Sequence, residues 1–84
     1  MMKLEKIENI NITDETYLDL SRIFDMMSPS MIRKINPNFV DFIKKKASKV
    51  KRFSTINPYI PIREQKLSKE VEIILGMIYV EYLQ

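Results

Sequence analysis

The sequence predicts an all-α or mostly α fold, a compact four-helix domain with one extended, proline-containing connection near residues 53–62. Two observations predict it. Apolar residues recur at spacings of three and four along several stretches, which is the period of an amphipathic helix. Proline also follows a capping residue twice, at Ser28-Pro29 and Asn36-Pro37, as it does where helices begin. The 84 residues are enough for one domain, in which residues 1–12 form a loosely attached N-terminal arm.

The first helix is predicted to begin near Thr13 or Asp14, because either side chain can accept a hydrogen bond from an amide of the first turn. The charged side chains Asp19, Arg22 and Asp25 are predicted to fall on the outer side of this helix. Its apolar residues share the other face: Tyr17, Leu20, Ile23, Phe24 and Met27.

Proline sets the boundaries of the next two helices. Pro29 disfavours a helical conformation at Ser28, so the first helix ends there and a short second helix is predicted over residues 29–35. Pro37 then begins the third helix. Its end stays open, because the pattern permits helix as far as Val50 and Ser48 permits an earlier stop. The apolar stripe of the third helix comprises Phe39, Phe42, Ile43, Ala47 and Val50, with Phe53 at its far end.

The last helix is predicted over residues 68–83, with Ser68 as its N-cap, after a connection whose two prolines exclude a helix interior. It is the longest apolar-periodic run, which predicts that it is the central helix of the fold. We expect Ile74, Leu75 and Ile78 to be buried between the first and third helices. Its main apolar face comprises Val71, Ile74, Leu75, Ile78 and Tyr82.

A second, narrower apolar stripe lies on another side of the last helix and is the candidate partner surface: Ile73, Met77 and Val80. Gly76 has no side chain, so another chain can approach closely there. Two alternatives cover this stripe. Residues 1–12 fold over it through Ile7, Ile10 and Ile12, which we favour because these isoleucines otherwise have no place in the core, or a second copy of the chain does so in a homodimer.

Several motifs occur in a recognisable order. An aromatic-x-x-aromatic core runs from Phe39 to Phe42 after a proline, a turn with Glu64-Gln65 precedes the last helix, and the chain closes on Tyr79 to Leu83. In these features residues 17–83 resemble a group of short uncharacterised proteins common in Firmicutes, which end like Ile-Tyr-Arg-Asp-Tyr-Leu. The resemblance implies an independently folding small bacterial protein with no known activity, and it carries over no site residues. Val80 stands where the group has arginine, which makes the second stripe more apolar.

The composition argues against an enzyme. The chain has no histidine and no cysteine, so the commonest general base and the usual thiolate ligands are missing, and we expect no cofactor and no metal. The single glycine lies inside a predicted helix, which excludes a glycine-rich phosphate loop. No run approaches the roughly 18 apolar residues that span a membrane. The absence of cysteine suits a cytoplasmic location.

Charge is unevenly distributed along the chain. Residues 31–66 hold ten basic and two acidic side chains, whereas residues 1–30 hold three basic and six acidic ones. We favour neutralisation of the middle by the acidic ends, with Glu70 and Glu81 in ion pairs with the basic middle of the chain. Glu64 and Gln65 are expected to satisfy loop amides or to cap the last helix. The alternative to neutralisation is an anionic partner such as nucleic acid, with Phe53 and Tyr59 stacking on bases. The basic strip comprises Lys44, Lys45, Lys49, Lys51 and Arg52, with Lys46 beside them.

These observations predict a small non-enzymatic cytoplasmic binding module that regulates or inhibits a protein partner of unknown identity. Size and composition also suit an inhibitor encoded by a phage or mobile element. The alternative function is a nucleic-acid-associated protein that uses the basic strip from Lys44 to Arg52. No membrane partner is expected.

Overall fold

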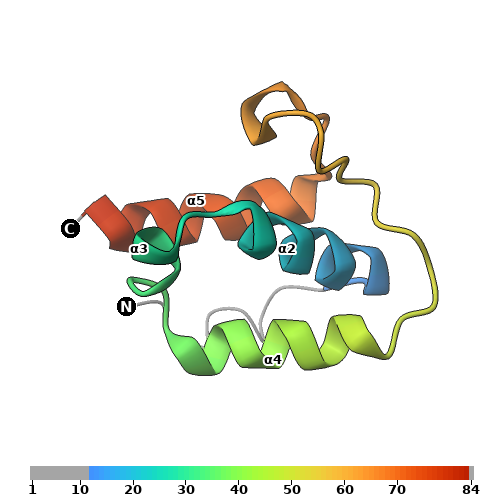
Figure 1. Ribbon diagram of the computed structural model, residues 1–84, viewed down its shortest axis with the longest axis horizontal. Helices are drawn as coiled ribbons and strands as arrows, with labels where there is room; N and C mark the ends of the chain where they lie inside the picture. The colour runs from blue at the N-terminus through green and yellow to red at the C-terminus, as the bar shows by residue number, and fades with distance from the viewer. Residues whose placement is uncertain (1–11, 84) are drawn as a thin grey trace.

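The computed structural model describes residues 12–83, and it describes side chains for residues 12–78. All of the regular structure in this part of the chain is helical, which confirms the predicted all-α class. Figure 1 shows α2, α4 and α5 side by side, with the loop that contains η1 projecting to one side. The elements are α2 (Asp14–Met26), α3 (Pro29–Ile32), α4 (Pro37–Ser48), the short 3-10 helix η1 (Ile62–Glu64) and α5 (Lys69–Leu83).

The three long helices begin at the capping residues that the sequence predicted. The Thr13 side chain accepts a hydrogen bond from the Thr16 amide, and Asn36 accepts one from the Asn38 amide. Ser68 Oγ likewise accepts from an amide of the first turn of α5, that of Val71. Each cap satisfies a donor that has no partner inside its helix, so these starts are set locally.

The end of the second helix differs from the prediction, and the end of the third is one of the two that the sequence allowed. The second helix was predicted over residues 29–35, but α3 ends at Ile32, and residues 33–35 form turns that lead into the next cap. The third helix takes the earlier of its two possible ends, Ser48. Because the helical period stops there, the next residues no longer follow the apolar stripe. Phe53, placed on that stripe by the pattern, is instead 98% exposed, so that prediction is wrong.

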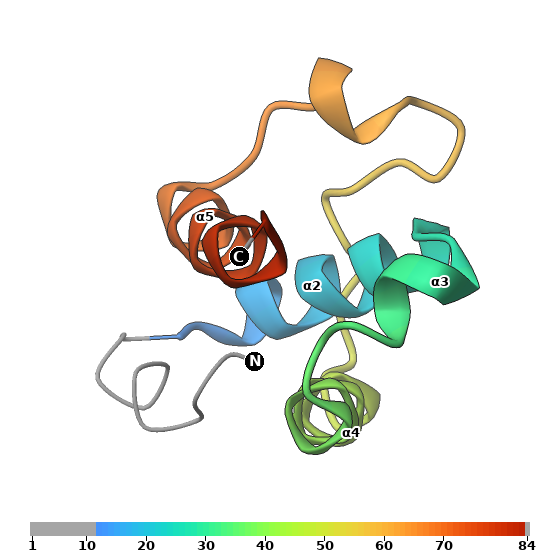
Figure 2. The ribbon, with the colours of Figure 1, turned by 90° about the vertical axis from the view of Figure 1, so that its left-hand side faces the viewer.

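The central helix is α2 and not α5. Both views place α2 between α4 and α5 (Figures 1 and 2), and α2 contacts α4 more extensively than it contacts α5. The prediction that residues 68–83 are central is therefore wrong. Only the short α3 segment separates α2 from α4, so these two helices become neighbours, whereas α5 follows a long connection and packs on the remaining side of α2.

The core joins all three long helices. Ile74, Leu75 and Ile78 are buried as predicted, but α5 packs against α2 rather than between α2 and α4. Phe24 of α2 and Phe39 of α4 pack edge to face, with ring centroids 5.8 Å apart. The connection contributes one fully covered residue, Ile56. The buried apolar residues are Leu20, Ile23, Phe24, Ile35, Phe39, Val40, Ile43, Ala47, Ile56, Val71, Ile74, Leu75 and Ile78.

Candidate functional site

A buried carboxylate fixes the chain after α4. Asp19 is only 2% exposed, although its spacing predicted a place on the outer side of the first helix, so that prediction is wrong. Its Oδ1 accepts hydrogen bonds from Ser54 Oγ (2.6 Å) and from the amides of Thr55 (2.9 Å) and Ile56 (3.3 Å), and its Oδ2 accepts one from Thr55 Oγ1 (2.6 Å). The segment 54–56 therefore covers Asp19 and supplies four donors, which compensates the loss of water around the carboxylate.

A second carboxylate ties α5 to the start of α2. Glu70 Oε2 accepts hydrogen bonds from Thr16 Oγ1 (2.6 Å), Thr13 Oγ1 (3.1 Å) and the Thr13 amide (3.2 Å). The hydrogen bond from Thr16 is the main reason that the pKa of Glu70 lies below its usual value of 4.5, and desolvation only partly opposes it. Among the residues that the structure describes, Glu70 forms no ion pair with the basic middle of the chain, so that prediction is wrong, and threonine donors bind its carboxylate instead. The side chain of Glu81 lies outside the described part of the chain.

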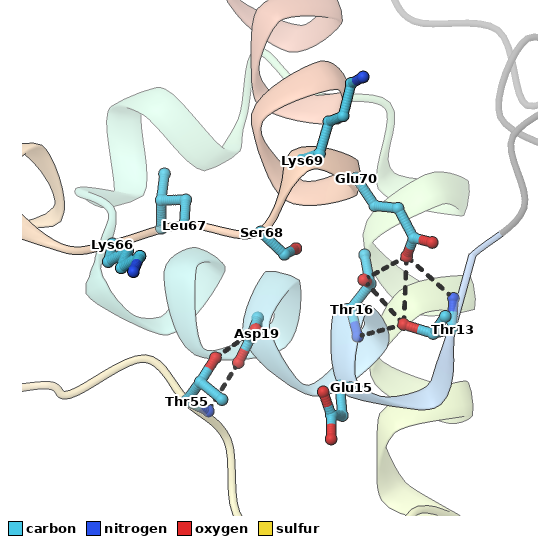
Figure 3. A pocket seen from close by; sticks show the side chains of 10 residues that line it. All are labelled: Thr13, Glu15, Thr16, Asp19, Thr55, Lys66, Leu67, Ser68, Lys69 and Glu70. Atoms are coloured by element: carbon cyan, nitrogen blue, oxygen red, sulfur yellow. Dashed lines mark hydrogen bonds between the residues drawn. The ribbon is translucent and has the colours of Figure 1, made fainter.

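A pocket of about 450 Å³ lies between these two carboxylates (Figure 3). Figure 3 shows Glu70 hydrogen-bonded to Thr13 and Thr16, and Asp19 hydrogen-bonded to Thr55. The hydrogen bonds of this pocket therefore join the start of α2 to α5 on one side, and α2 to the connection after α4 on the other. In the part of the chain that the structure describes, no group of three or more His, Cys, Asp or Glu side chains gathers as metal ligands do. The pocket is lined by Thr13, Glu15, Thr16, Asp19, Thr55, Lys66, Leu67, Ser68, Lys69 and Glu70.

Gln65 braces the projecting loop, as the expectation that it satisfies loop amides predicted. Its Oε1 accepts from the Asn57 amide (2.8 Å), and its Nε2 donates to the carbonyl oxygens of Asn57 (2.7 Å) and Ile60 (2.9 Å). The Asn57 side chain also accepts from the Tyr59 amide, which makes a compact turn. The loop is thus held by side chains, while Tyr59 at its tip is 92% exposed.

An apolar groove of about 770 Å³ separates this loop from α5 and the end of α2. At Gly76 the groove is open, because a Cβ atom built there would meet no atom within 4 Å apart from its chain neighbours and the backbone of its own helix. The charged residues Arg63 and Glu72 come from opposite walls. The groove is lined by Met26, Pro61, Ile62, Arg63, Gln65, Leu67, Glu72, Leu75 and Gly76.

The predicted second stripe of α5 is not one uniform surface. Ile73 is 45% exposed, whereas Met77 is half-buried and packs against the core. The side chain of Val80 and the residues Ile7 and Ile10 lie outside the described part of the chain. Ile12, the remaining isoleucine of the predicted arm, is half-buried against the core.

The basic strip is partly neutralised by α2. Lys44 Nζ lies 3.0 Å from Asp25 Oδ1, and one Arg52 guanidinium nitrogen lies 3.8 Å from Glu15 Oε1. All five residues of the strip are exposed. Lys45, Lys49 and Lys51 form no ion pair with any residue that the structure describes. The predicted strip therefore divides into two paired cations and three that face water.

Comparison with known proteins adds no relative: no family model matches the chain, and no curated protein or solved structure is significantly similar to it. Within residues 12–83, the helices are all too short or too polar to cross a membrane.

Proposed function

We propose that this protein is a small non-enzymatic binding module that regulates or inhibits a protein partner by holding an apolar segment of that partner in the groove between α5 and residues 61–67. The observation that carries the proposal is the groove itself. Its volume of about 770 Å³ falls within the range of roughly 300–1,000 Å³ that is common for binding pockets. Its lining combines aliphatic side chains with two opposite charges, Arg63 and Glu72, that can orient a bound segment.

The loop wall of the groove supports the proposal because it is ordered before any partner arrives. The Gln65 side chain donates two hydrogen bonds to residues 57–60 and accepts one from them. A surface that is already ordered loses less conformational entropy on binding than a flexible one. Tyr59 at the loop tip adds an exposed aromatic side chain, a residue type that often anchors protein interfaces.

An apolar helix is the partner segment that suits this surface best. Amphipathic helices bind by laying their apolar face into a hydrophobic groove. Gly76 leaves room for such a helix to approach the α5 backbone, and Ile73 continues the exposed apolar surface one turn earlier on α5. The partner that supplies this helix is either another protein or a second copy of the chain in a homodimer.

The non-enzymatic role, the cytoplasmic location and the phage or mobile-element origin in this proposal rest on composition. The lack of histidine and cysteine supports a binding role over catalysis, and the lack of cysteine suits the cytoplasm. A regulatory or inhibitory role follows if the bound segment is one that the partner needs for its own activity. Size and composition suit a phage or mobile-element inhibitor.

Substitutions at Gly76 test the proposal. Gly76→Arg should fill the open groove with a long charged side chain, whereas Gly76→Ala should leave it open and stabilise α5 by about 0.5–1 kcal/mol. Each protein would be used as bait for affinity capture from nuclease-treated cell extract. We expect a protein to be captured by wild type and Gly76→Ala and lost with Gly76→Arg. Equal capture by all three baits, or capture by none, would contradict the proposal, and sedimentation of the same variants tests the homodimer.

A further inference from the structure

Phe53 stands out among the described side chains because it is the most exposed large apolar one, at 98%. It is not on a loose segment. The next three residues, 54–56, all bond to the buried Asp19 carboxylate, and Ile56 is inserted into the core. The backbone is therefore anchored directly after Phe53, and the exposed ring projects from this point, next in the chain to the cations Lys51 and Arg52.

A hollow of about 290 Å³ lies beside this ring, between α2, the end of α4 and residues 52–54. Three cations line it, Arg22, Lys44 and Arg52, and Asp25 is the acidic residue among its lining. Asp25 pairs with Lys44, so neither guanidinium group has an acidic partner among the residues that line the hollow. Arg22 is exposed and makes no ion pair with any residue in the described part of the chain, and Arg52 reaches Glu15 only at 3.8 Å.

We propose that this hollow binds single-stranded nucleic acid, with one base stacked on Phe53 and the adjacent phosphates held by Arg22 and Arg52. Stacking on an aromatic ring accepts any base, since every base has a flat face. A guanidinium group matches the geometry of a phosphate through paired hydrogen bonds. Lys49 and Lys51 are both exposed and add positive charge beyond the hollow for the rest of the bound nucleic-acid strand.

The dimensions favour a single strand over a duplex. About 290 Å³ is at the lower limit of binding pockets, so the hollow suits one unit of a chain whose remainder runs across the surface. In a duplex the bases are stacked on one another, and their faces are not available to Phe53. This site also differs from the basic strip predicted along the third helix, because Arg22 comes from α2 and Lys45 does not line the hollow.

The first test is binding of a short labelled oligothymidylate and of a duplex of equal length, measured by fluorescence anisotropy at several salt concentrations. We expect the single strand to bind more tightly, with an affinity that falls as salt rises. Phe53→Ala should weaken that binding by about 5- to 150-fold, the range that loss of one stacked base implies. Because Phe53 is exposed, the thermal unfolding of the Phe53→Ala variant should be the same as that of the wild type. Equal binding of the duplex, or affinity unaffected by Phe53→Ala, would overturn the proposal.

A direct optical readout is available because the chain contains no tryptophan. Phe53→Trp introduces a single tryptophan at the stacking position, which can be excited selectively over the four tyrosines, and we expect the oligothymidylate to quench it. An unquenched tryptophan in a protein that still binds the strand would place the base elsewhere and overturn the proposal.

A charge-matched pair separates this site from general attraction to positive charge. Arg22→Gln and Arg63→Gln each remove one positive charge, but only Arg22 lines the hollow. We expect Arg22→Gln to weaken binding and to reduce the salt slope by about 0.7, the value for one phosphate of a single strand. Equal effects of the two substitutions would show general attraction and contradict the proposal. Displacement of the strand by polyglutamate as readily as by unlabelled oligothymidylate would instead assign the hollow to an acidic protein.

Discussion

The helical bundle of α2, α4 and α5 and the connection of residues 49–68 are held in place by different forces. In the bundle, buried aliphatic and aromatic side chains from three helices pack into one cluster. In the connection, Ile56 is the one apolar residue of that segment that is fully buried. Two polar side chains, Asp19 and Gln65, make most of the side-chain hydrogen bonds that shape the rest.

The difference has a consequence for function. Apolar contacts are numerous and non-directional, so the bundle does not depend on one geometry at one atom. The connection depends on a few directional hydrogen bonds, and a single substitution can release it. Both proposed binding features, the groove beside residues 61–67 and the hollow beside Phe53, have one wall in this connection. Loss of Asp19 or Gln65 should therefore affect binding more than it affects the bundle.

The largest effect is expected from breaking the bundle. Phe39 is fully buried between α4 and α2, so Phe39→Ala should lower the free energy of unfolding by about 3–5 kcal/mol, as large-to-small core substitutions of phenylalanine do. Phe53→Ala is the matched control, since it makes the same chemical change at an exposed position and should cost almost nothing. Urea denaturation of the two variants measures the difference, and similar midpoints would show that the core has been wrongly placed.

A smaller loss of stability is expected when the hydrogen bonds that hold the connection are broken. Asp19→Ala removes the acceptor of the Thr55 amide and of the Thr55 hydroxyl, and leaves the buried Ile56 amide with Ser54 Oγ as its acceptor, which should cost about 1–3 kcal/mol. Hydrogen exchange should show the loss to be local, with the amides of residues 55 and 56 exchanging faster while those in the middle of α4 stay protected. Asp19→Asn keeps one acceptor oxygen, so its stability should lie between those of the wild type and Asp19→Ala. Uniformly faster exchange throughout the chain would refute the distinction between the two regions.

The smallest effect concerns acid sensitivity at the junction of α2 and α5. Because the pKa of folded Glu70 lies below 4.5, its contribution to stability is fully present above that pH and is lost as the pH falls through the lower, folded value. Thr16→Val removes the principal donor and should raise the Glu70 pKa toward 4.5, which carbon-13 NMR titration of its carboxyl group can measure. An unchanged pKa in this variant would exclude Thr16 as the cause.

Much of the candidate site was beyond sequence analysis. The role of Gln65 was one of two that the sequence allowed, satisfying loop amides or capping the last helix, and its hydrogen bonds to Asn57 and Ile60 decide for the loop. The hollow could not be anticipated, because it combines Arg22 with Phe53, and no periodicity links residues so far apart. The groove likewise joins Met26 to Gly76 through the position of the loop between them. The pattern did identify the cations of the strip, but not which of them are neutralised by α2.

The sequence by itself determined where the long helices begin and which of their faces are apolar. A cap acts on amides two or three residues away, and the helical period relates neighbours within one turn, so both are local properties. Only the tertiary structure decided that α2 is central, that Asp19 is buried and that Phe53 is exposed. Burial depends on which distant segment covers a face. Asp19 is enclosed by residues 54–56, which follow it in the chain by 35 to 37 positions. Such a contact forms only when the whole chain folds, because bringing distant segments together is favourable only with the burial of the shared core.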